Sequence, residues 1–246
     1  MEQFTYRQGE AHCENVALKT IAAEVGTPCY IYSKASLNGQ VRKLKEAFAS
    51  YPTLLCYAVK ANSNLSVLRE IFQEGMGADI VSLGELERSL KAGVKPSEVI
   101  YSGVGKRDDE IQRALDVGIY SFNVESQAEL ENIARLAKIA GKIAPVSLRI
   151  NPNIDAKTNP KIATGLFSTK FGLVEMEALE LVRLAADHPH LQIKGIGCHF
   201  GSQILYLKPM AEAVERIVAF ARIVQGQGHK LDFIDMGGGL GIRYLD

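Results

Sequence analysis

Short apolar runs rich in β-branched residues alternate along the chain with longer segments whose apolar residues recur every three or four positions. Runs of the first kind predict strands, and segments of the second kind predict amphipathic helices. The expected strands are residues 54–59, 78–82, 99–102, 119–124, 146–151, 193–199 and 231–236. The expected helices are residues 65–74, 83–92, 108–117, 126–140, 175–186 and 209–225. This alternation predicts an α/β fold with a parallel sheet.

Residues suited to chemistry stand at or just past the carboxyl ends of successive predicted strands. They are Lys60, Asp79, Gly103, Glu125, Arg149, His199 and Gly237. In a closed barrel the carboxyl ends of all strands meet at one mouth, whereas an open doubly wound sheet would spread these residues along a line. We therefore expect a (β/α)8 barrel of the TIM type that is short by one strand.

The first 34 residues differ in character from the repeating units. A short helix is broken at Gly26 to Pro28, residues 29–33 predict a strand, and residues 35–48 predict an amphipathic helix. We expect residues 1–34 to form an N-terminal segment outside the barrel, and residues 35–246 to form the incomplete barrel.

Charge and composition narrow the classes of function. The formal net charge is zero, which argues against nucleic acid or an anionic membrane as the partner. No apolar stretch reaches the ~20 residues that cross a bilayer, and the N-terminus lacks the features of a secretion signal. The four cysteines include no C-x-x-C pair, so we expect reduced thiols and no metal site. We expect a cytoplasmic protein with a small-molecule partner.

Lys60 is the first candidate for chemistry, because it follows an apolar strand directly. An amine held against an apolar wall loses hydration, and its neutral form then becomes available to attack a carbonyl. Such a lysine is suited to a Schiff base. The alternative is a strand-end lysine whose ammonium group extends into water.

Two later segments are suited to a phosphorylated, planar ligand. Three consecutive glycines, Gly237, Gly238 and Gly239, let backbone amides approach an anion closely. A dinucleotide-binding G-x-G-x-x-G motif fails, because its last position is Ile242; a tight structural turn stays the alternative. His199 follows another strand, where its ring can lie against a planar cofactor, and Ser202 can donate to phosphate. A packed core histidine is the alternative there.

Three charged side chains near these strand ends are further candidates for the site. Asp79 and Glu85 place two carboxylates near the lysine, although Glu85 also suits the first turn of a helix. Arg149, at another strand end, is suited to holding a carboxylate or a phosphate.

The order of these motifs along one chain resembles a known family. They are the segments 26–33 (GTPCYIYS), 57–62 (YAVKAN), 77–82 (GADIVS), 123–126 (NVES), 149–152 (RINP), 164–165 (TG), 170–172 (KFG), 199–203 (HFGSQ) and 235–239 (DMGGG). Together they are similar to the diaminopimelate decarboxylases, which have the alanine-racemase-like fold type of pyridoxal-phosphate enzymes. The resemblance covers nearly the whole chain.

The resemblance implies a cofactor, a reaction and roles for individual residues. It implies pyridoxal 5'-phosphate bound to Lys60 as a Schiff base, with His199 stacked on the pyridine ring. Ser202, Gly237, Gly238 and Gly239 would bind the phosphate, and Asp79, Glu85 and Arg149 would line the pocket. The implied reaction converts meso-2,6-diaminopimelate to L-lysine and CO₂ in a homodimer, as the last step of lysine biosynthesis.

The sequence also departs from the family pattern. In the family an eighth strand brings a Glu-Pro-Gly-Arg segment, and a β-domain, which packs with the N-terminal segment, then supplies a cysteine across the dimer interface. This chain stops at Asp246, so we expect a fragment that is inactive by itself. Asn159 stands where the family pattern has a histidine.

Three alternatives to this function stay open. Ornithine, arginine or carboxynorspermidine could replace diaminopimelate as the substrate, because the groups that choose the substrate are outside this chain. A non-catalytic, single-domain pyridoxal-phosphate carrier would have no β-domain. A catalytically inactive, decarboxylase-like partner is the third alternative, and the presence of Lys60 and His199 argues against it.

Overall fold

The structure, a computed structural model, describes residues 3–152, 172–199 and 201–242. Its first elements are the strands β1 (Phe4–Arg7), β2 (Glu10–Cys13) and β3 (Val16–Ala17), which form an antiparallel sheet. The helices α1 (Leu18–Val25) and α2 (Lys34–Ala47) follow. The sequence did not predict the three short strands.

The strand predicted at residues 29–33 is wrong. These residues have no regular structure, and Tyr30 and Tyr32 are exposed. The alternation of apolar residues fits a strand, but a strand also needs a hydrogen-bonded neighbour, and the strands described nearby pair among themselves. Ser33 instead caps α2, because its hydroxyl accepts a hydrogen bond from the Ser36 amide.

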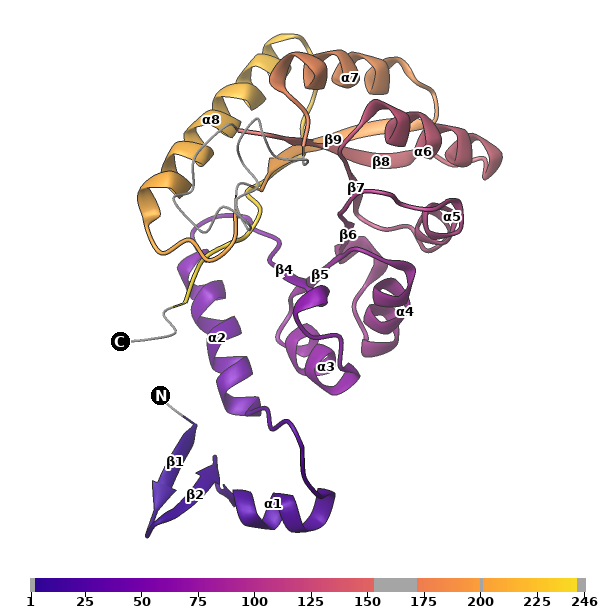
Figure 1. The fold of residues 1–246 in the computed structure, drawn as a ribbon. Helices are drawn as coiled ribbons and strands as arrows, with labels where there is room; N and C mark the ends of the chain where they lie inside the picture. Colours follow the sequence, from indigo (N-terminus) through magenta and orange to yellow (C-terminus); the bar gives the residue numbers. More distant parts are fainter. Residues whose placement is uncertain (1–2, 153–171, 200, 243–246) are drawn as a thin grey trace. The chain divides into compact units, whose positions relative to one another are not determined.

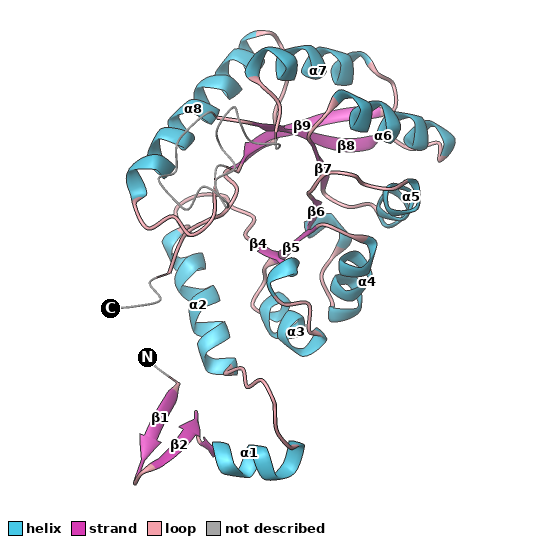
Figure 2. Cartoon of the chain, viewed as in Figure 1, coloured by secondary structure: helices cyan, strands magenta, loops and turns pink. Residues whose placement is uncertain are grey.

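All seven strands and six helices predicted for the barrel are confirmed. The strands are β4 (Cys56–Ala58), β5 (Gly77–Ile80), β6 (Val99–Tyr101), β7 (Ser121–Val124), β8 (Ala144–Ile150), β9 (Leu191–Cys198) and β10 (Phe233–Asp235). The helices are α3 (Leu65–Gln73), α4 (Leu83–Ala92), α5 (Asp108–Val117), α6 (Gln127–Ile139), α7 (Glu175–Asp187) and α8 (Leu207–Gly226). Figures 1 and 2 show helices following strands along the chain.

The strand order identifies the fold class. The parallel strands are neighbours in the order in which they occur in the chain, from β4 to β10. A doubly wound sheet reverses its order at a switch point, whereas a (β/α)8 barrel adds each new strand on the same side of the previous one. The fold is therefore α/β, of the (β/α) barrel type, with seven barrel strands among the described residues.

The chain forms two compact units. The first comprises Met1–Asp79 with Gly84–Glu98, and the second comprises Ile80–Leu83 with Val99–Asp246. Within the described residues, no helix combines the length with the apolar character that a membrane crossing needs.

In the first unit, ion pairs and hydrogen bonds join neighbouring elements. The guanidinium group of Arg42, on α2, binds both carboxylate oxygens of Glu74 at the end of α3, at 2.9 and 2.6 Å. Glu14, which follows β2, accepts hydrogen bonds from the Ser33 hydroxyl and the Ala35 amide at the start of α2. The short N-terminal sheet is thereby tied to α2.

In the second unit, one face of the sheet is apolar and covered by helices. Val146, Leu148 and Ile150 alternate along β8 and are almost fully buried, while α6 and α7 pack against this strand. Figure 1 shows α6, α7 and α8 along the same side of β8 and β9. Successive side chains of a strand point to opposite faces, so the residues between these three belong to the other face.

That other face of the second unit carries polar side chains and glycines. Ser147 on β8 is paired in register with Gly195 on β9, and Arg149 is paired with Gly197. Gly195 in turn faces Phe233 of β10, whose ring occupies the space where a side chain at position 195 would lie. By register, Ser147 and Phe233 share one level of the inner face, and Arg149 and Asp235 share the next level toward the carboxyl ends of the strands.

Candidate functional site

Lys60 lies in a single 3₁₀ turn, Val59–Ala61, that begins directly after β4. Val59 is fully buried and anchors the turn, whereas Lys60 is exposed. The described residues therefore do not supply the apolar wall that the sequence analysis expected around the amine. The exposed ammonium group is nevertheless accessible to a ligand at the carboxyl end of a parallel strand, where barrel enzymes bind substrates.

The carboxylates predicted near Lys60 lie in the same compact unit. Asp79 is half-buried on β5 and is paired in register with Ala58, two residues before the lysine. Glu85 lies in the first turn of α4. The predicted placement of Asp79 at the end of the strand beside Lys60 is confirmed.

Arg149 and Glu125 form an ion pair at the carboxyl ends of β8 and β7 in the second unit. Nη1 of Arg149 is 2.8 Å from Oε1 of Glu125, and the two side chains are 16% and 2% exposed. The amide of Gly172 donates to the second carboxylate oxygen of Glu125, at 3.3 Å. An arginine whose carboxylate partner is buried has a fixed position, because leaving that carboxylate unpaired would be costly.

The buried Lys106 holds the turn that carries Glu125. Nζ of Lys106 donates to the carbonyl oxygens of Gly103 and Asn123 and forms an ion pair with Glu129. The other carboxylate oxygen of Glu129 accepts a hydrogen bond from the Glu125 amide, at 2.9 Å. These contacts fix the turn between β7 and α6, and hence the position of Glu125.

His199 and the three glycines lie next to each other in the second unit. The amide of Gly238 donates to Nδ1 of His199 at 3.4 Å, which leaves the ring proton on Nε2. The amide of Gly237 donates to Oδ1 of Asp235, at 2.8 Å. Ser202 is exposed in the loop that follows His199. The structure thus brings together the histidine and the glycine loop that the sequence predicted separately.

The three glycines meet different surroundings. Gly237 and Gly239 have φ angles of +66° and +94°, and a Cβ at either position would collide with a carbonyl oxygen, that of Cys198 or Gly201. A Cβ at Gly238 would have nothing within 4 Å. The outer two glycines are needed for the backbone to fold here, whereas Gly238 leaves open space where a side chain would lie. This loop fits the close approach of a phosphate group.

A polar cluster whose members have no assigned role in the sequence prediction lies on the inner face of the second unit. Nδ2 of Asn123 donates to Asp235 at 3.0 Å and to the Ser102 hydroxyl at 3.1 Å, and Oδ1 accepts from the Ser147 hydroxyl at 2.6 Å. The available signal was a polar residue inside each apolar strand segment. Period-2 alternation could have placed each of them on the inner face.

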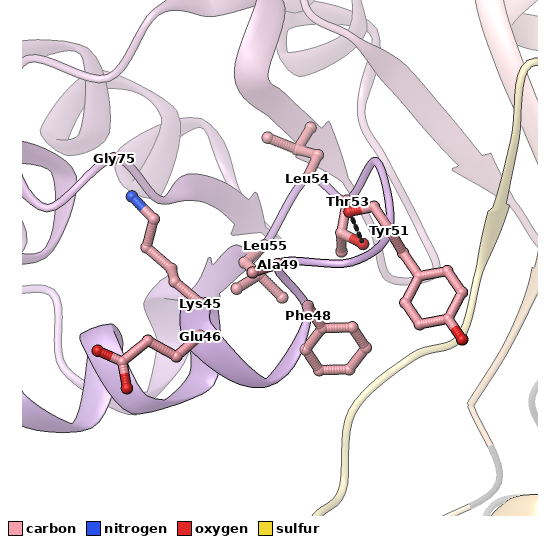
Figure 3. A pocket seen from close by; sticks show the side chains of 9 residues that line it. All are labelled: Lys45, Glu46, Phe48, Ala49, Tyr51, Thr53, Leu54, Leu55 and Gly75. Carbon is pink, nitrogen blue, oxygen red and sulfur yellow. Dashed lines mark hydrogen bonds between the residues drawn. The ribbon is translucent and has the colours of Figure 1, made fainter.

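A separate hollow in the first unit contains none of the predicted residues. Its volume is about 440 Å³. Figure 3 shows the side chains that line it: Lys45, Glu46, Phe48, Ala49, Tyr51, Thr53, Leu54, Leu55 and Gly75. These residues come from the end of α2, the segment before β4 and the turn after α3. Because barrel chemistry takes place at the opposite, carboxyl ends of the strands, we do not assign the function to this hollow.

Some predicted motif residues lie outside the described residues. They are Asn159, Thr164, Gly165, Lys170, Phe171 and Phe200.

Comparison with known proteins decides the family. The pyridoxal binding domain of the pyridoxal-dependent decarboxylases matches residues 34–246. The chain belongs to this family. Pyridoxal 5'-phosphate is therefore the cofactor of this decarboxylase domain, in agreement with the resemblance of the motifs.

Individual relatives of this decarboxylase domain are similar over its whole length. It is 49% identical to the diaminopimelate decarboxylase of Pseudomonas aeruginosa over 246 residues, which are 100% of this chain and 59% of that protein. A crystal structure of diaminopimelate decarboxylase from Helicobacter pylori, complexed with L-lysine, has a TM-score of 0.89 and 44% identity. That match covers 92% of this chain and 58% of the other.

A more distant solved structure is that of a lysine/ornithine decarboxylase. The lysine/ornithine decarboxylase of Vibrio vulnificus, complexed with putrescine, has a TM-score of 0.77 and 27% identity over 92% of this chain and 57% of that one. The decarboxylase domain described here spans about 59% of the length of its curated relatives.

Proposed function

We propose that the protein containing this chain decarboxylates meso-2,6-diaminopimelate to L-lysine and CO₂, with pyridoxal phosphate as the cofactor. The observation that carries the proposal is the similarity to diaminopimelate decarboxylases along the entire chain, at up to 49% identity. The likeness to a lysine/ornithine decarboxylase is weaker, at 27% identity. Diaminopimelate is therefore the better-supported substrate, and ornithine is the comparison that a test needs.

The proposal assigns a role to each predicted site residue. Bound pyridoxal phosphate supplies an electron-accepting ring that stabilises the carbanion left after loss of CO₂. Lys60 holds the cofactor covalently through its amine, and His199 packs its ring against the cofactor. Asp79 and Arg149 line the pocket. The phosphate binds at Ser202 and at the glycine loop Gly237, Gly238 and Gly239.

The environment of His199 supports its assignment. Because the Gly238 amide donates to Nδ1, this nitrogen carries no proton. This contact holds the imidazole ring beside the glycine loop, which supports a role for both in binding one ligand.

Three further parts of the proposal concern the whole protein. Residues 1–34 pack with a β-domain, the full-length protein forms a homodimer, and the enzyme works in the cytoplasm. The greater length of the relatives supports a further domain, whereas the homodimer and the cytoplasmic location rest on the resemblance of the motifs. Residues 1–246 expressed alone are expected to be inactive and to bind the cofactor only weakly, which absorbance titration with pyridoxal phosphate measures.

The activity is tested by incubating the full-length protein with meso-diaminopimelate, or with ornithine, and measuring CO₂. We expect CO₂ from diaminopimelate alone, and none from the variant Lys60→Ala. Lys91→Ala, which removes an exposed lysine from α4, is the matched control and should keep the activity. CO₂ from ornithine alone would reverse the substrate assignment, and an active Lys60→Ala variant would contradict the role of the lysine.

A further inference from the structure

Asp235 occupies an unusual position between the inner face of the sheet and the glycine loop. Its Oδ1 accepts a hydrogen bond from the amide of Gly237, and its Oδ2 accepts one from Nδ2 of Asn123, which lies 112 positions earlier in the chain. The two oxygens of one carboxylate therefore connect the strand β7 to the first glycine after β10.

The inner partner of Asp235 is itself held in one orientation. A carboxylate can only accept hydrogen bonds, so the end of the Asn123 amide that faces Asp235 must be its NH₂ group. The oxygen of that amide then faces the Ser147 hydroxyl, which donates to it at 2.6 Å. The Ser102 hydroxyl accepts the second amide proton at 3.1 Å. Hydroxyls from β8 and from the end of β6 thereby fix the asparagine.

Two strands, β8 and β9, lie between Asn123 and Asp235, and β9 has a glycine beside the carboxylate. Asp235 is paired in register with Gly197 of β9. A Cβ at position 197 would lie 2.6 Å from Cβ of Asp235 and 3.0 Å from its carbonyl oxygen. Any side chain at position 197 would therefore displace Asp235 from its present position.

We propose that Asp235 is a positioning residue for the phosphate site. Its carboxylate anchors the start of the Gly237–Gly238–Gly239 loop to the inner face, and this anchor sets the shape of the loop against which the cofactor phosphate binds. This inference rests on the proposed function, because it requires pyridoxal phosphate at the glycine loop. It adds Asp235, supported by Asn123, to the residues that determine cofactor affinity.

The negative charge of Asp235 opposes the binding of a phosphate nearby. A carboxylate close to a phosphate site repels the bound phosphate, so Asp235 does not serve by direct attraction. Its contribution must come from geometry, since an unanchored glycine loop has many conformations and would have to lose that freedom when the phosphate binds. Charge and geometry therefore predict opposite effects for variants of Asp235, and an experiment can separate them.

The test compares pyridoxal phosphate with pyridoxal, which has the same aldehyde and no phosphate. The full-length apoenzyme is titrated with each aldehyde, and absorbance gives the two dissociation constants. The dissociation constant for pyridoxal divided by that for pyridoxal phosphate isolates the contribution of the phosphate, and a higher ratio means stronger binding of the phosphate. For Asp235→Ala we expect this ratio to fall about tenfold, the effect of losing one well-made hydrogen bond, while pyridoxal affinity changes little.

The matched variants separate geometry from charge. Asp235→Asn removes the charge but can still accept from the Gly237 amide, provided that the Asn123 amide rotates by half a turn. We expect it to keep the ratio within about threefold, well inside the loss of a hydrogen bond. Asp232→Ala removes an exposed aspartate three residues earlier, and it should leave the ratio unchanged.

Other outcomes overturn the inference in distinct ways. An unchanged ratio in Asp235→Ala would remove the positioning role, and a higher ratio in both Asp235→Ala and Asp235→Asn would show that only charge repulsion matters. If Asp235→Ala does not fold, Asn123→Ala must lower the ratio in its place, and an unchanged ratio there overturns the inference. Failure of the wild-type protein to react with either aldehyde would instead refute the proposed function.

Discussion

Glu125 and Arg149 form an ion pair between adjacent strands, with Oε1 and Nη1 2.8 Å apart and the Glu125 side chain 2% exposed. The Glu125 carboxylate also accepts a hydrogen bond from the Gly172 amide, and the backbone amide of Glu125 donates to Glu129. A pair so well surrounded positions Arg149 more than it stabilises the fold, because burying two charges offsets much of their attraction.

Removal of the carboxylate from this pair should be costly. Glu125→Ala leaves a half-buried guanidinium group without its ionic partner, so we expect the free energy of unfolding to fall by about 3 kcal/mol, the lower end for a broken buried pair. Urea denaturation measures this change. Glu131→Ala, an exposed residue of the neighbouring helix α6, is the control and should change stability by less than about 0.5 kcal/mol. Equal effects would show that the burial of Glu125 is unimportant.

The three consecutive glycines should respond differently to alanine. Gly237→Ala and Gly239→Ala add a Cβ against a carbonyl oxygen at a positive φ, so we expect losses of stability above about 1 kcal/mol. Gly238→Ala meets open space and should unfold at the same temperature as the wild type, yet its dissociation constant for pyridoxal phosphate should rise at least about tenfold. Thermal unfolding and absorbance titration give the two quantities. Normal cofactor affinity in Gly238→Ala would exclude this position from the phosphate site.

Cysteine reactivity should follow burial. Cys29 is exposed and Cys198 is buried, and burial, together with the charge of Asp235, raises the pKa of the Cys198 thiol to about 12. Because the thiolate is the reactive form, we expect a disulfide reagent at pH 8 to modify Cys29 first and Cys198 only after unfolding. Mass spectrometry of the modified peptides shows the order. Labelling of Cys198 in the folded protein at the rate of Cys29 would contradict the described burial.

Glu110 should make stability depend on acid pH. Burial opposes ionisation of this carboxyl, but hydrogen bonds from the amides of Arg107 and Leu83, together with Tyr101 and the charge of Arg107, outweigh it and hold the pKa below its ordinary value of 4.5. A depressed pKa contributes stability that is present above about pH 4.5 and is lost as the pH falls further. We expect Glu110→Gln to be less stable at pH 7 and to lose less stability than the wild type between pH 5 and pH 3.

Denaturant midpoints at several pH values check this dependence. Glu180→Gln changes an exposed glutamate on α7 and should follow the wild-type curve. Parallel curves for Glu110→Gln and the wild type would show that the two amide hydrogen bonds have no net effect on the ionisation of Glu110.

Local patterns predicted the barrel elements well because helix and strand periodicity is a property of neighbouring residues. The boundaries of α4 and α5 agree with the sequence prediction at both ends. Residues 29–33 show where the same reasoning fails: their alternation is that of a strand, but a strand forms only beside a partner. Lys60 likewise follows an apolar run as predicted, yet it lies in a 3₁₀ turn and is exposed.

The sequence by itself determined the succession of strands and helices and the motifs that identify the family, because both depend on residue types at short spacing. Only the tertiary structure decided that Asn123 and Asp235 share a hydrogen bond and that Gly238, unlike its two neighbours, borders open space. Such contacts depend on how distant strands pair in register. A shift of one residue would turn each of these side chains to the other face of the sheet.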